Sequence, residues 1–585
     1  MPAATDTVVV GTVAGVAADV DGVSGQVCAL ELADGTDLAL PDGQSLAVTG
    51  KALLGAGSSI GRATAGAAGT APTLEIAGLL ELAGDAALDG VGLDLVHGGA
   101  TTGTVDVKKH RLTVTGPAES SWVDGAVVRE TTAEPPGAVE LVGDADLDLG
   151  GSLAVNNMAA VRLTAPSGST TPSPTITTSA GTATIVGDGR LRWDAGTLDG
   201  NLRLSVRTSM EGSGLRIISA TSTLTNLGLV EVMANTVQTE GTIRNQGELR
   251  LFPGAQLQSV ESEATPALVN DSGNPASPAI LAVGASDSVA ASGPAIVSLK
   301  EVPLRNDGVI SIVAGARLQL SGPGSPEPRT VSVLHPGSRL RDPFPVPASP
   351  PSTYVPPPAG RLIVRAGSTL KMRGATTLEG RAILELGDAM GAGRLEADPQ
   401  TGATFAGASA RAGAFHWRDG TVVGPLTTSK ITTDVGKNND TSRRILTNPT
   451  NAPTALTLGG PSAVNASYVE LAANARVRVT AVTTVASAPG GFKRIGPIDG
   501  QSVTVALGGT LFRVASATTP TGSSMTSAPA TIDVPVVNHG SVLLQTSLKV
   551  PAGYRQSLQP GAPASAAKPI TGLFGTSSAR RATLA

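Results

Sequence analysis

The sequence contains few large side chains. Aromatic residues make up 2% of its 585 positions, and only three of them are tryptophan. A thick globular core is hard to fill without such residues, whereas a thin interior of stacked Val, Leu, Ile and Ala needs none. The shortage therefore argues against a compact enzyme fold and favours a solenoid.

Charge and cysteine are also scarce, and each shortage excludes a class of protein. Charged residues make up 15% of the chain, and the formal net charge is −5. The basic runs Lys108–Arg111 and Arg443–Arg444 are isolated, so we expect ordinary solvated side chains there and no nucleic-acid partner. The single cysteine, Cys28, excludes a disulfide framework and a multi-cysteine metal site. Because the five histidines are far apart in sequence, we expect no metal or other cofactor.

Long apolar runs are missing as well. No stretch approaches the roughly 18 to 20 apolar residues that span a bilayer, so we expect no membrane span. Residues 1–20 lack the basic region of a secretory signal peptide, and glycines interrupt their apolar run. Export is expected to need a signal of another type or one outside this sequence.

Apolar residues at every second position are frequent. Hydrophobic residues make up 41% of the chain, and many alternate with polar ones, as in GELRLFP at 247–253. The 72 glycines and 41 prolines would also suit a disordered chain. The alternation favours short strands over disorder for most of the sequence.

All three tryptophans stand in one sequence frame, with glycine at the third position after each. They are Trp122, Trp193 and Trp417. A residue this rare that recurs in one frame indicates internal duplication. We interpret the frame as a strand followed by a Gly-Thr turn, with the indole covering a corner or a step between turns. A platform on which sugars stack is the alternative.

A second motif reads apolar-x-Asn-x-Gly-x-apolar-x-apolar. Its four copies centre on Asn226 and Gly228, Asn245 and Gly247, Asn306 and Gly308, and Asn538 and Gly540. The first two copies are about 20 residues apart, and the next spacing is close to three times that, so one turn is expected to take ~20 residues. Asn and Gly suit tight turns because both tolerate positive φ.

A third motif supports the same period. Leu80-Glu81-Leu82 recurs as Val139-Glu140-Leu141, and each copy precedes Gly-Asp. The spacing of about 60 residues is interpreted as three turns. Three short strands joined by tight turns fit such a period, and helical spacing is hard to find. We predict an all-β fold, a parallel β-helix (β-solenoid) of ~20-residue coils with Ser/Thr/Pro-rich loop excursions.

The W-x-x-G-T frame together with the L-T-N and N-x-G motifs resembles the repeats of large bacterial β-helix surface, adhesin-like or filament proteins. The motif positions run from about Leu80 to Leu544, which is most of the chain. The resemblance implies an extracellular or cell-surface location. Such proteins usually carry an export signal and an anchoring segment, and neither is recognised in this sequence.

The sequence suggests six segments. They are an N-terminal strand, cap or oligomer contact at 1–20, a first β-helical segment at 21–135, a second at 136–341, a Pro-rich linker or loop at 342–360, a third β-helical segment at 361–550 that is related to the second, and a flexible tail at 551–585. The relation between the two long segments follows from the matching frames of Trp193 and Trp417, each of which is followed by a Leu-Thr-Asn motif at nearly the same distance.

Few residues point to chemistry. Asp144, Asp146 and Asp148 have the spacing that opens a calcium loop, but Leu149 stands where that loop needs glycine. As alternating strand residues, the three carboxylates would share a solvated face that could hold calcium weakly.

Enzymes built on β-helices gather carboxylates and basic residues on one face across adjacent coils. The candidates here are Asp194, Asp199, Asp419 with Arg418, and His416. They form pairs and lack the density of a carbohydrate cleft. We therefore expect no catalytic residues.

These observations favour a non-enzymatic structural β-helical rod, extracellular or surface-exposed, that serves as an adhesin stalk or as a subunit of a filament or appendage. The expected partners are further copies of the chain or other surface and appendage proteins, with carbohydrate as a further candidate. The alternative is a polysaccharide-binding or polysaccharide-cleaving β-helix protein of tailspike or pectate-lyase type.

Overall fold

The fold is taken from a computed structural model. It describes residues 7–10, 25–63, 70–98, 101–132, 137–165, 173–233, 235–259, 267–271, 278–284, 295–313, 316–321, 330–343, 359–366, 368–388, 391–407, 413–436, 442–448, 454–465, 468–486, 491–496, 499–514, 530–544 and 548–556.

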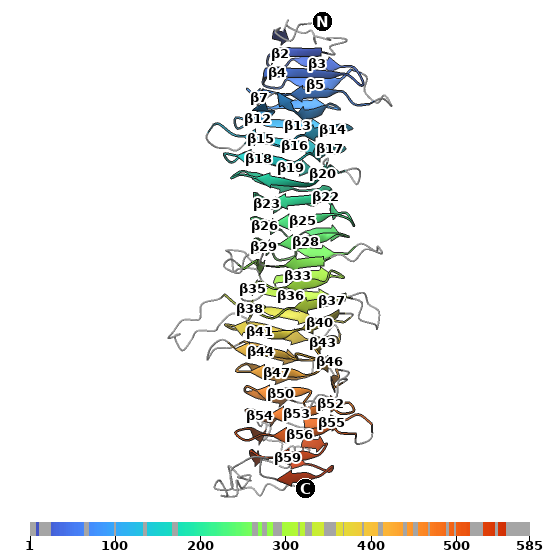
Figure 1. Cartoon of the computed structure of the whole chain (residues 1–585), viewed down its shortest axis with the longest axis vertical. Helices are drawn as coiled ribbons and strands as arrows, with labels where there is room; N and C mark the ends of the chain where they lie inside the picture. Colours follow the sequence, from blue (N-terminus) through green and yellow to red (C-terminus); the bar gives the residue numbers. More distant parts are fainter. Residues whose placement is uncertain are drawn as a thin grey trace, which may run out of the picture. The chain divides into compact units, whose positions relative to one another are not determined.

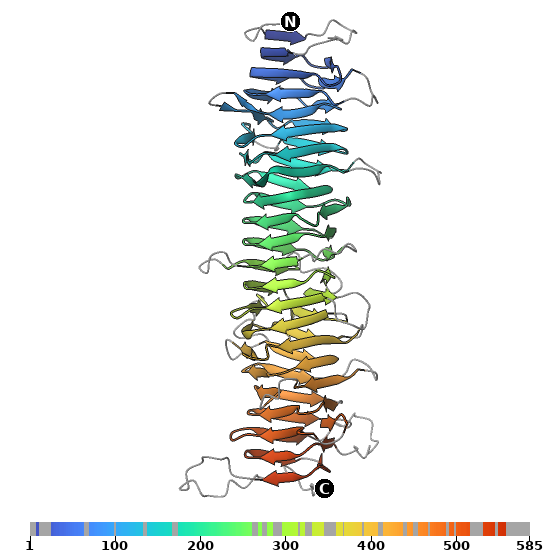
Figure 2. The ribbon, with the colours of Figure 1, turned by 45° about the vertical axis from the view of Figure 1, so that its right-hand side comes forward.

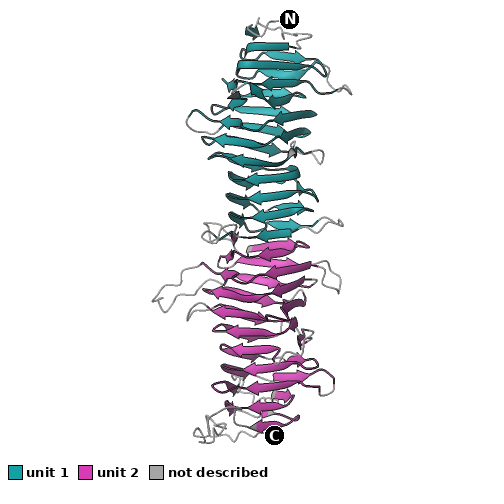
Figure 3. Cartoon of the chain, viewed as in Figure 1, with its two compact units in different colours: residues 1–279 teal, residues 280–585 magenta. Residues whose placement is uncertain are grey.

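Strands are the only regular elements among the described residues, which form 62 strands and no helix. The chain divides into two compact units, residues 1–279 and 280–585 (Figure 3). Within each unit three strands make one turn, and a strand usually pairs in parallel with the strand three places along the chain, as β24 does with β27 (Figures 1 and 2). The predicted all-β parallel β-helix is therefore confirmed.

Unit 1 contains three parallel ladders. The first ladder holds β6 (Thr73–Ile76), β9 (Gly92–Leu95), β14 (Ala118–Trp122), β17 (Ala145–Leu149), β24 (Arg216–Ile218), β27 (Thr236–Thr239) and β30 (Gln256–Gln258). The second holds β1 (Thr7–Val10), β7 (Leu79–Leu82), β12 (Thr104–Asp106), β15 (Ala126–Arg129), β18 (Ser152–Asn156), β25 (Thr223–Asn226), β28 (Thr242–Asn245) and β31 (Ala267–Asn270). The third holds β3 (Asp37–Leu40), β5 (Ser59–Arg62), β8 (Ala86–Asp89), β13 (Arg111–Thr115), β16 (Ala138–Val142), β19 (Ala160–Thr164), β21 (Arg190–Trp193), β23 (Arg207–Met210), β26 (Leu229–Val232) and β29 (Glu248–Leu251).

Four long strands of unit 1 belong to both the first and the second ladder. They are β2 (Gly25–Leu32), β4 (Ser45–Leu54), β20 (Thr175–Val186) and β22 (Gly196–Leu204). Each continues around the corner between the two ladders, so that the first half of β22 pairs with β24 and its second half with β25. One short antiparallel pair, β10 (His97–Gly98) with β11 (Thr101–Thr102), projects from this unit.

Unit 2 repeats the arrangement. Its first ladder holds β33 (Ala295–Lys300), β36 (Ala316–Ser321), β39 (Arg361–Val364), β42 (Ile383–Leu386), β45 (Ala414–Trp417), β48 (Thr432–Val435), β51 (Ser462–Asn465), β54 (Val482–Ala486), β57 (Thr510–Val514) and β60 (Ser541–Leu544). The second holds β34 (Leu304–Asn306), β37 (Thr330–Leu334), β40 (Ser368–Met372), β43 (Gly393–Ala397), β46 (Gly420–Val423), β49 (Arg444–Thr447), β52 (Tyr468–Leu471), β55 (Gly491–Arg494), β58 (Ala530–Asp533) and β61 (Leu548–Lys549). The third holds β32 (Ile280–Val283), β35 (Val309–Ile312), β38 (Arg339–Arg341), β41 (Gly374–Glu379), β44 (Ala403–Gly407), β47 (Leu426–Ser429), β50 (Leu456–Gly459), β53 (Arg476–Val479), β56 (Ser502–Val505), β59 (Val536–Asn538) and β62 (Tyr554–Gln556).

The interior consists of aliphatic columns. Leu202, Leu224, Ile243 and Leu268 are register partners on successive turns of the second ladder of unit 1, and all four are buried. Alternation along each strand sends every second side chain into this interior. Each such buried side chain stabilises the fold by roughly 1.5 to 3 kcal/mol, so no aromatic core is needed.

Turn length varies more than the predicted period of about 20 residues. The shortest turn in the described third ladders runs from Arg190 to its register partner Arg207, and the longest runs from Arg339 to Thr377. The strands still pair in register, because the extra residues lie in the chain between the paired strands.

The interpretation of the spacing from Glu81 to Glu140 as three turns is wrong. Leu80 lies in β7 of the second ladder, whereas Val139 lies in β16 of the third. The shared motif marks a strand that ends at a Gly-Asp corner, and more than one corner of a turn uses it. Because loops change the turn length, sequence spacing does not count turns.

Strand pairing continues across two predicted segment boundaries. In unit 1, β13 pairs with β16 on the two sides of the boundary at 135. In unit 2, β38 pairs with β41 around the Pro-rich segment 342–360. This direct pairing is the arrangement expected of a loop from one turn, although 344–358 lie outside the described residues.

The two predicted terminal segments are described only in part. In the segment 1–20, β1 pairs in parallel with β2. In the predicted tail 551–585, residues 554–556 form β62, which pairs with β59. The strand β62 therefore belongs to the solenoid, and the remainder, 557–585, lies outside the described residues.

Candidate functional site

Each tryptophan ends a strand at a corner of the solenoid. Trp122, Trp193 and Trp417 are the last residues of β14, β21 and β45, and at most 1% of each side chain is exposed. The glycines at the third position after them have φ values of +83°, +122° and +97°, a region that favours glycine. Since the indoles are buried, a sugar cannot stack on them.

The three indoles differ in their hydrogen bonds. Trp122 Nε1 donates to the carbonyl oxygen of Leu93 at 2.9 Å, and Trp417 Nε1 donates to that of Gly420 at 3.1 Å. Trp193 Nε1 has no partner among the described residues. In unit 1 the frame also occupies two different corners, because β14 belongs to the first ladder and β21 to the third.

A buried arginine lies beside two of these corners on the following turn. Arg216 is the register partner of Gly196, and its side chain is fully buried. Its Nε donates to the carbonyl oxygen of Trp193 at 2.7 Å, and its terminal nitrogens donate to carbonyl oxygens of Glu211, Gly212 and Gly214. Burial lowers the pKa of the guanidinium from its usual value, and the nearby Asp194 opposes this shift.

Arg444 has the same role in unit 2. It is the register partner of Gly420, and it donates at 3.0 to 3.2 Å to four carbonyl oxygens, those of Arg418, Gly436, Ser442 and Tyr468. Only 4% of Arg444 is exposed, so the expectation of a solvated side chain is wrong here. Little in the sequence indicates that Arg216 and Arg444 are buried. The one feature that they share is that isoleucine follows each of them.

The asparagines of the N-x-G motif are buried and serve the backbone. Asn226 and Asn245 are register partners, and Asn226 Nδ2 donates to Asn245 Oδ1 at 2.7 Å. Asn245 Nδ2 donates in turn to Asn270 Oδ1 at 2.7 Å. Asn270 does not match the N-x-G motif, because the next glycine follows it by three residues and not by two. The side chains thus form a hydrogen-bonded column inside unit 1.

In unit 2 the asparagines of the motif bond the glycine two residues later, and Asn538 also bonds the next turn. Asn306 Nδ2 donates to the carbonyl oxygen of Gly308 at 3.0 Å. Asn538 Oδ1 accepts the N–H of Gly540 at 3.0 Å, and its Nδ2 donates to the hydroxyl of Tyr554 at 2.9 Å. Each amide therefore fixes the corner that follows its own strand.

The expected reason for glycine in this motif is wrong. Gly228, Gly247, Gly308 and Gly540 do not have positive φ. Gly228, Gly247 and Gly540 are needed for close approach instead, since a Cβ at Gly247 would lie 2.3 Å from the carbonyl oxygen of Gly228 on the preceding turn. The motif marks a position where backbones of successive turns touch.

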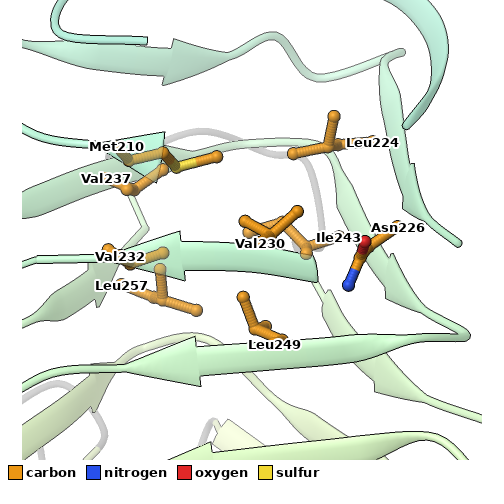
Figure 4. Close-up of a pocket in the computed structure, with 9 residues that line it drawn as sticks. All are labelled: Met210, Leu224, Asn226, Val230, Val232, Val237, Ile243, Leu249 and Leu257. Carbon is orange, nitrogen blue, oxygen red and sulfur yellow. The ribbon is translucent and has the colours of Figure 1, made fainter. Parts of the chain in front are cut away.

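A cavity beside the asparagine column is small and apolar. It has a volume of about 10 Å³, and Met210, Val230, Leu249 and their aliphatic neighbours surround it, with Asn226 at its edge (Figure 4). A space of this size barely holds one water molecule. It is a gap in packing and offers no room for a substrate.

Ion pairs connect successive turns on the third ladder of unit 1. Glu140 lies 3.2 Å from Arg111 on the preceding turn and 3.8 Å from Arg162 on the next. Glu231 pairs in the same way with Arg207 at 2.8 Å and Arg250 at 3.4 Å. Such cross-strand pairs add up to about 1 kcal/mol each at partly exposed positions.

Five charged side chains meet on the first ladder of unit 2. Arg361 pairs with Glu385 at 2.7 Å, and Arg418 pairs with Asp434 at 2.7 Å and lies 3.1 Å from His416 Nδ1. Burial raises the pKa of Glu385, but His416 and Arg361 outweigh it and hold that pKa below its usual value. Both carboxylates, Glu385 and Asp434, are engaged in ion pairs.

The carboxylates considered for catalysis have structural contacts or lie apart. Asp194 pairs with Arg192 at 2.7 Å. Asp419 Oδ1 accepts the N–H groups of Gly420 at 2.7 Å and Arg443 at 2.9 Å, which caps the Trp417 corner. Asp199 is exposed on the first ladder of unit 1.

The first ladder of unit 1 presents carboxylates to solvent. Asp146 and Asp148 both lie on β17, where Asp146 accepts the N–H of Thr175 at 2.7 Å and Asp148 accepts the hydroxyl of Thr177 at 3.2 Å. Asp144 precedes this strand. Within the described residues, no group of three or more His, Cys, Asp or Glu side chains is arranged to hold a metal ion.

Comparison with protein-family models, with curated proteins and with solved structures found no match to this chain. The described part of the chain contains no helix with the length and hydropathy of a membrane-spanning segment. The architecture and its internal contacts are therefore the basis for any assignment of function.

Proposed function

We propose that this chain is a non-enzymatic structural β-solenoid, which serves as an adhesin stalk or as a subunit of a surface filament or appendage. The observation that carries the proposal is the unbroken parallel pairing within each unit. The described third ladders hold ten strands in unit 1 and eleven in unit 2. At about 4.8 Å per turn, each unit alone extends for roughly 50 Å.

The use of the polar motif residues supports a structural role. The buried Asn226 and Asn245 bond each other, and the buried Arg216 and Arg444 bond backbone carbonyl oxygens. A catalytic group must reach a substrate, whereas these groups are closed off by their own turns. Their contacts run along the stack and resist separation of successive turns.

The location and the partners depend on the resemblance of the repeats to bacterial surface β-helix proteins. A stalk needs stiffness and a surface for contact with partners. The exposed faces of the ladders supply the contact surface. Further copies of the chain or other surface and appendage proteins are the partners that this role requires.

Electron microscopy of the purified chain tests the structural role. We expect each unit to appear as an elongated segment of roughly 50 Å in high salt, where charged contacts between molecules are screened. Globular particles without such segments would contradict the proposal. Release of reducing sugar ends from a panel of bacterial and plant polysaccharides would contradict its non-enzymatic part.

Surface labelling tests the location. An impermeant amine-reactive reagent applied to intact cells that express the natural gene should modify exposed lysines such as Lys51 and Lys371. Labelling only after lysis would place the protein inside the cell and would refute the surface assignment.

A further inference from the structure

One sheet face of unit 1 carries carboxylates over successive strands. We call it the acidic face. It consists of the outward residues of β6, β9, β14, β17 and the first halves of β20 and β22, and its carboxylates are Glu75, Asp94, Glu119, Asp146, Asp148 and Asp199. The other outward positions are mostly Ser and Thr, and no Lys or Arg points outward from these described strand segments.

The acidic face differs from the rest of its unit. Among the described residues, no Lys, Arg or His forms an ion pair with Glu75, Asp94, Glu119 or Asp199, whereas the third ladder neutralises carboxylates such as Glu231 with arginines on both sides. In unit 1, charges are therefore paired on the third ladder, whereas negative charge is in excess on the acidic face.

Repulsion within the acidic face is visible at two neighbouring turns. Glu75 and Asp94 are register partners. Burial, reinforced by the charge of Glu75, raises the pKa of Asp94 to about 6. A cationic surface placed over these strands would relieve this repulsion.

A face of opposite charge lies in unit 2. We call it the basic face. It consists of the outward residues of β50, β53, β56, β59 and β62, and its charged residues are Arg476, Arg478 and Arg555. All three are exposed, and no ion pair joins them to a described carboxylate. The positions between them are Thr, Ser, Gly and Val, with no Asp or Glu among the described outward residues.

We propose that the acidic face of one copy docks on the basic face of a second copy, so that the chains associate side by side. The two faces are complementary in charge, and both are parallel sheets. Strands in both therefore repeat at about 4.8 Å, and charged columns on two copies can stay in register over successive turns. The small Ser and Thr side chains between the charges allow close approach. This inference rests on the proposed structural role and names its partner.

Exposed ion pairs are individually weak, so the contact is expected to depend on salt. Sedimentation of the full chain should show association at about 20 mM salt, with an association constant at least about tenfold smaller at about 500 mM. A chain that stays monomeric at about 20 mM salt and about 100 μM protein would overturn the proposal, while the elongated segments expected in high salt would remain unaffected.

Charge reversal tests the two faces separately. Glu119→Lys with Asp199→Lys changes only exposed residues of the acidic face, and Arg478→Glu with Arg555→Glu does the same on the basic face. Each double variant should be monomeric at the same low salt. Association that survives either reversal would show that another surface is used.

Mixing the two double variants is the decisive measurement, because the unmodified acidic face of one variant can still meet the unmodified basic face of the other. The mixture should associate with a constant within about tenfold of the unmodified chain. If both variants are monomeric alone and the mixture stays monomeric too, the two faces do not meet, and the proposal fails.

Two control variants separate the faces from net charge. Arg190→Glu with Arg305→Glu, and Glu31→Lys with Glu240→Lys, change the net charge equally at positions outside both faces. They should associate like the unmodified chain. Circular dichroism of every variant should show the same strand content, which excludes misfolding as the cause of lost association.

Discussion

Asn226 Nδ2 donates a hydrogen bond to Asn245 Oδ1 at 2.7 Å, and the two residues are register partners on adjacent turns. The stretch of chain between them therefore makes one complete turn. The bond also joins two side chains that would each cost free energy if buried alone.

Removing the middle amide of this column should destabilise unit 1. Asn245→Ala removes the buried hydrogen bonds to Asn226 Nδ2 and to Asn270 Oδ1, and we expect the free energy of unfolding to fall by about 2 to 3 kcal/mol. Denaturant titration followed by circular dichroism measures the change. Gln238→Ala, at a half-buried outward position of β27, is the control and should change stability by less than about 0.5 kcal/mol. Equal effects of the two variants would contradict the role of the column.

Replacement of the buried Arg216 by lysine should destabilise the fold, although both side chains are basic. Lysine cannot reach the carbonyl oxygens that surround this side chain at once, so Arg216→Lys should lower the free energy of unfolding by about 3 kcal/mol or more. The exposed Arg203→Lys should be nearly neutral. Urea midpoints of the two variants give the comparison, and a neutral Arg216→Lys would show that the observed bonds contribute little.

Trp193 and Trp417 allow a test of the indole hydrogen bond at two similar corners. Trp417→Phe loses the bond to the carbonyl oxygen of Gly420, whereas Trp193→Phe loses none among the described residues. Both lose similar apolar volume. We expect Trp417→Phe to be the more destabilising by about 1 kcal/mol. Thermal unfolding of the two variants measures the difference, and the reverse order would refute this account of the corners.

Glycine at the tryptophan corners is required for conformation and for space. Gly420 has φ of +97°, and a Cβ there would lie 2.1 Å from the carbonyl oxygen of Gly393. Gly420→Ala should therefore lower the free energy of unfolding by at least about 2 kcal/mol. Gly61→Ala is the matched control, since nothing lies within 4 Å of its added Cβ and its φ is not positive. This control should be neutral or slightly stabilising in the same denaturant titration.

Stability should depend on pH through Asp94. Its folded pKa of about 6 is higher than the unfolded value near 3.9, so the native state binds the proton more tightly. This contribution is fully present below about pH 4 and is lost as pH rises through about 6; its size is about 3 kcal/mol.

Asp94→Asn should remove this part of the pH dependence. Between pH 5 and 7 the variant should lose less stability with rising pH than the unmodified chain, and it should be the more stable of the two at pH 8. The exposed Asp199→Asn serves as control. Identical pH profiles for the unmodified chain and Asp94→Asn, from urea titrations at each pH, would show that Asp94 titrates normally.

The sequence predicts the class of fold because its signals are local. The shortage of aromatics, the period-two alternation and the frame around Trp193 all depend on neighbouring residues. The register between turns is not local, since it depends on how many residues each corner loop takes. For that reason the spacing of Asn226 and Asn245 indicates one turn, whereas the spacing from Glu81 to Glu140 does not indicate three.

The contacts that matter most at the corners were also hidden from the sequence. Arg444 resembles any surface arginine in the sequence, but its own turn and the two neighbouring turns place four carbonyl oxygens around its side chain. The acidic face is equally dispersed, because Glu75 and Asp199 are far apart in the sequence. Only stacking brings them to one side of the unit.

The turn from Arg190 to Arg207 and the turn from Arg339 to Thr377 differ widely in length, yet both keep their place in the ladders, because only the strand segments are held to a fixed pitch. A gene for such a chain can gain or lose codons at the corners without disturbing the neighbouring rungs. New loops can therefore be gained one at a time, because the pairing of the strands does not depend on them.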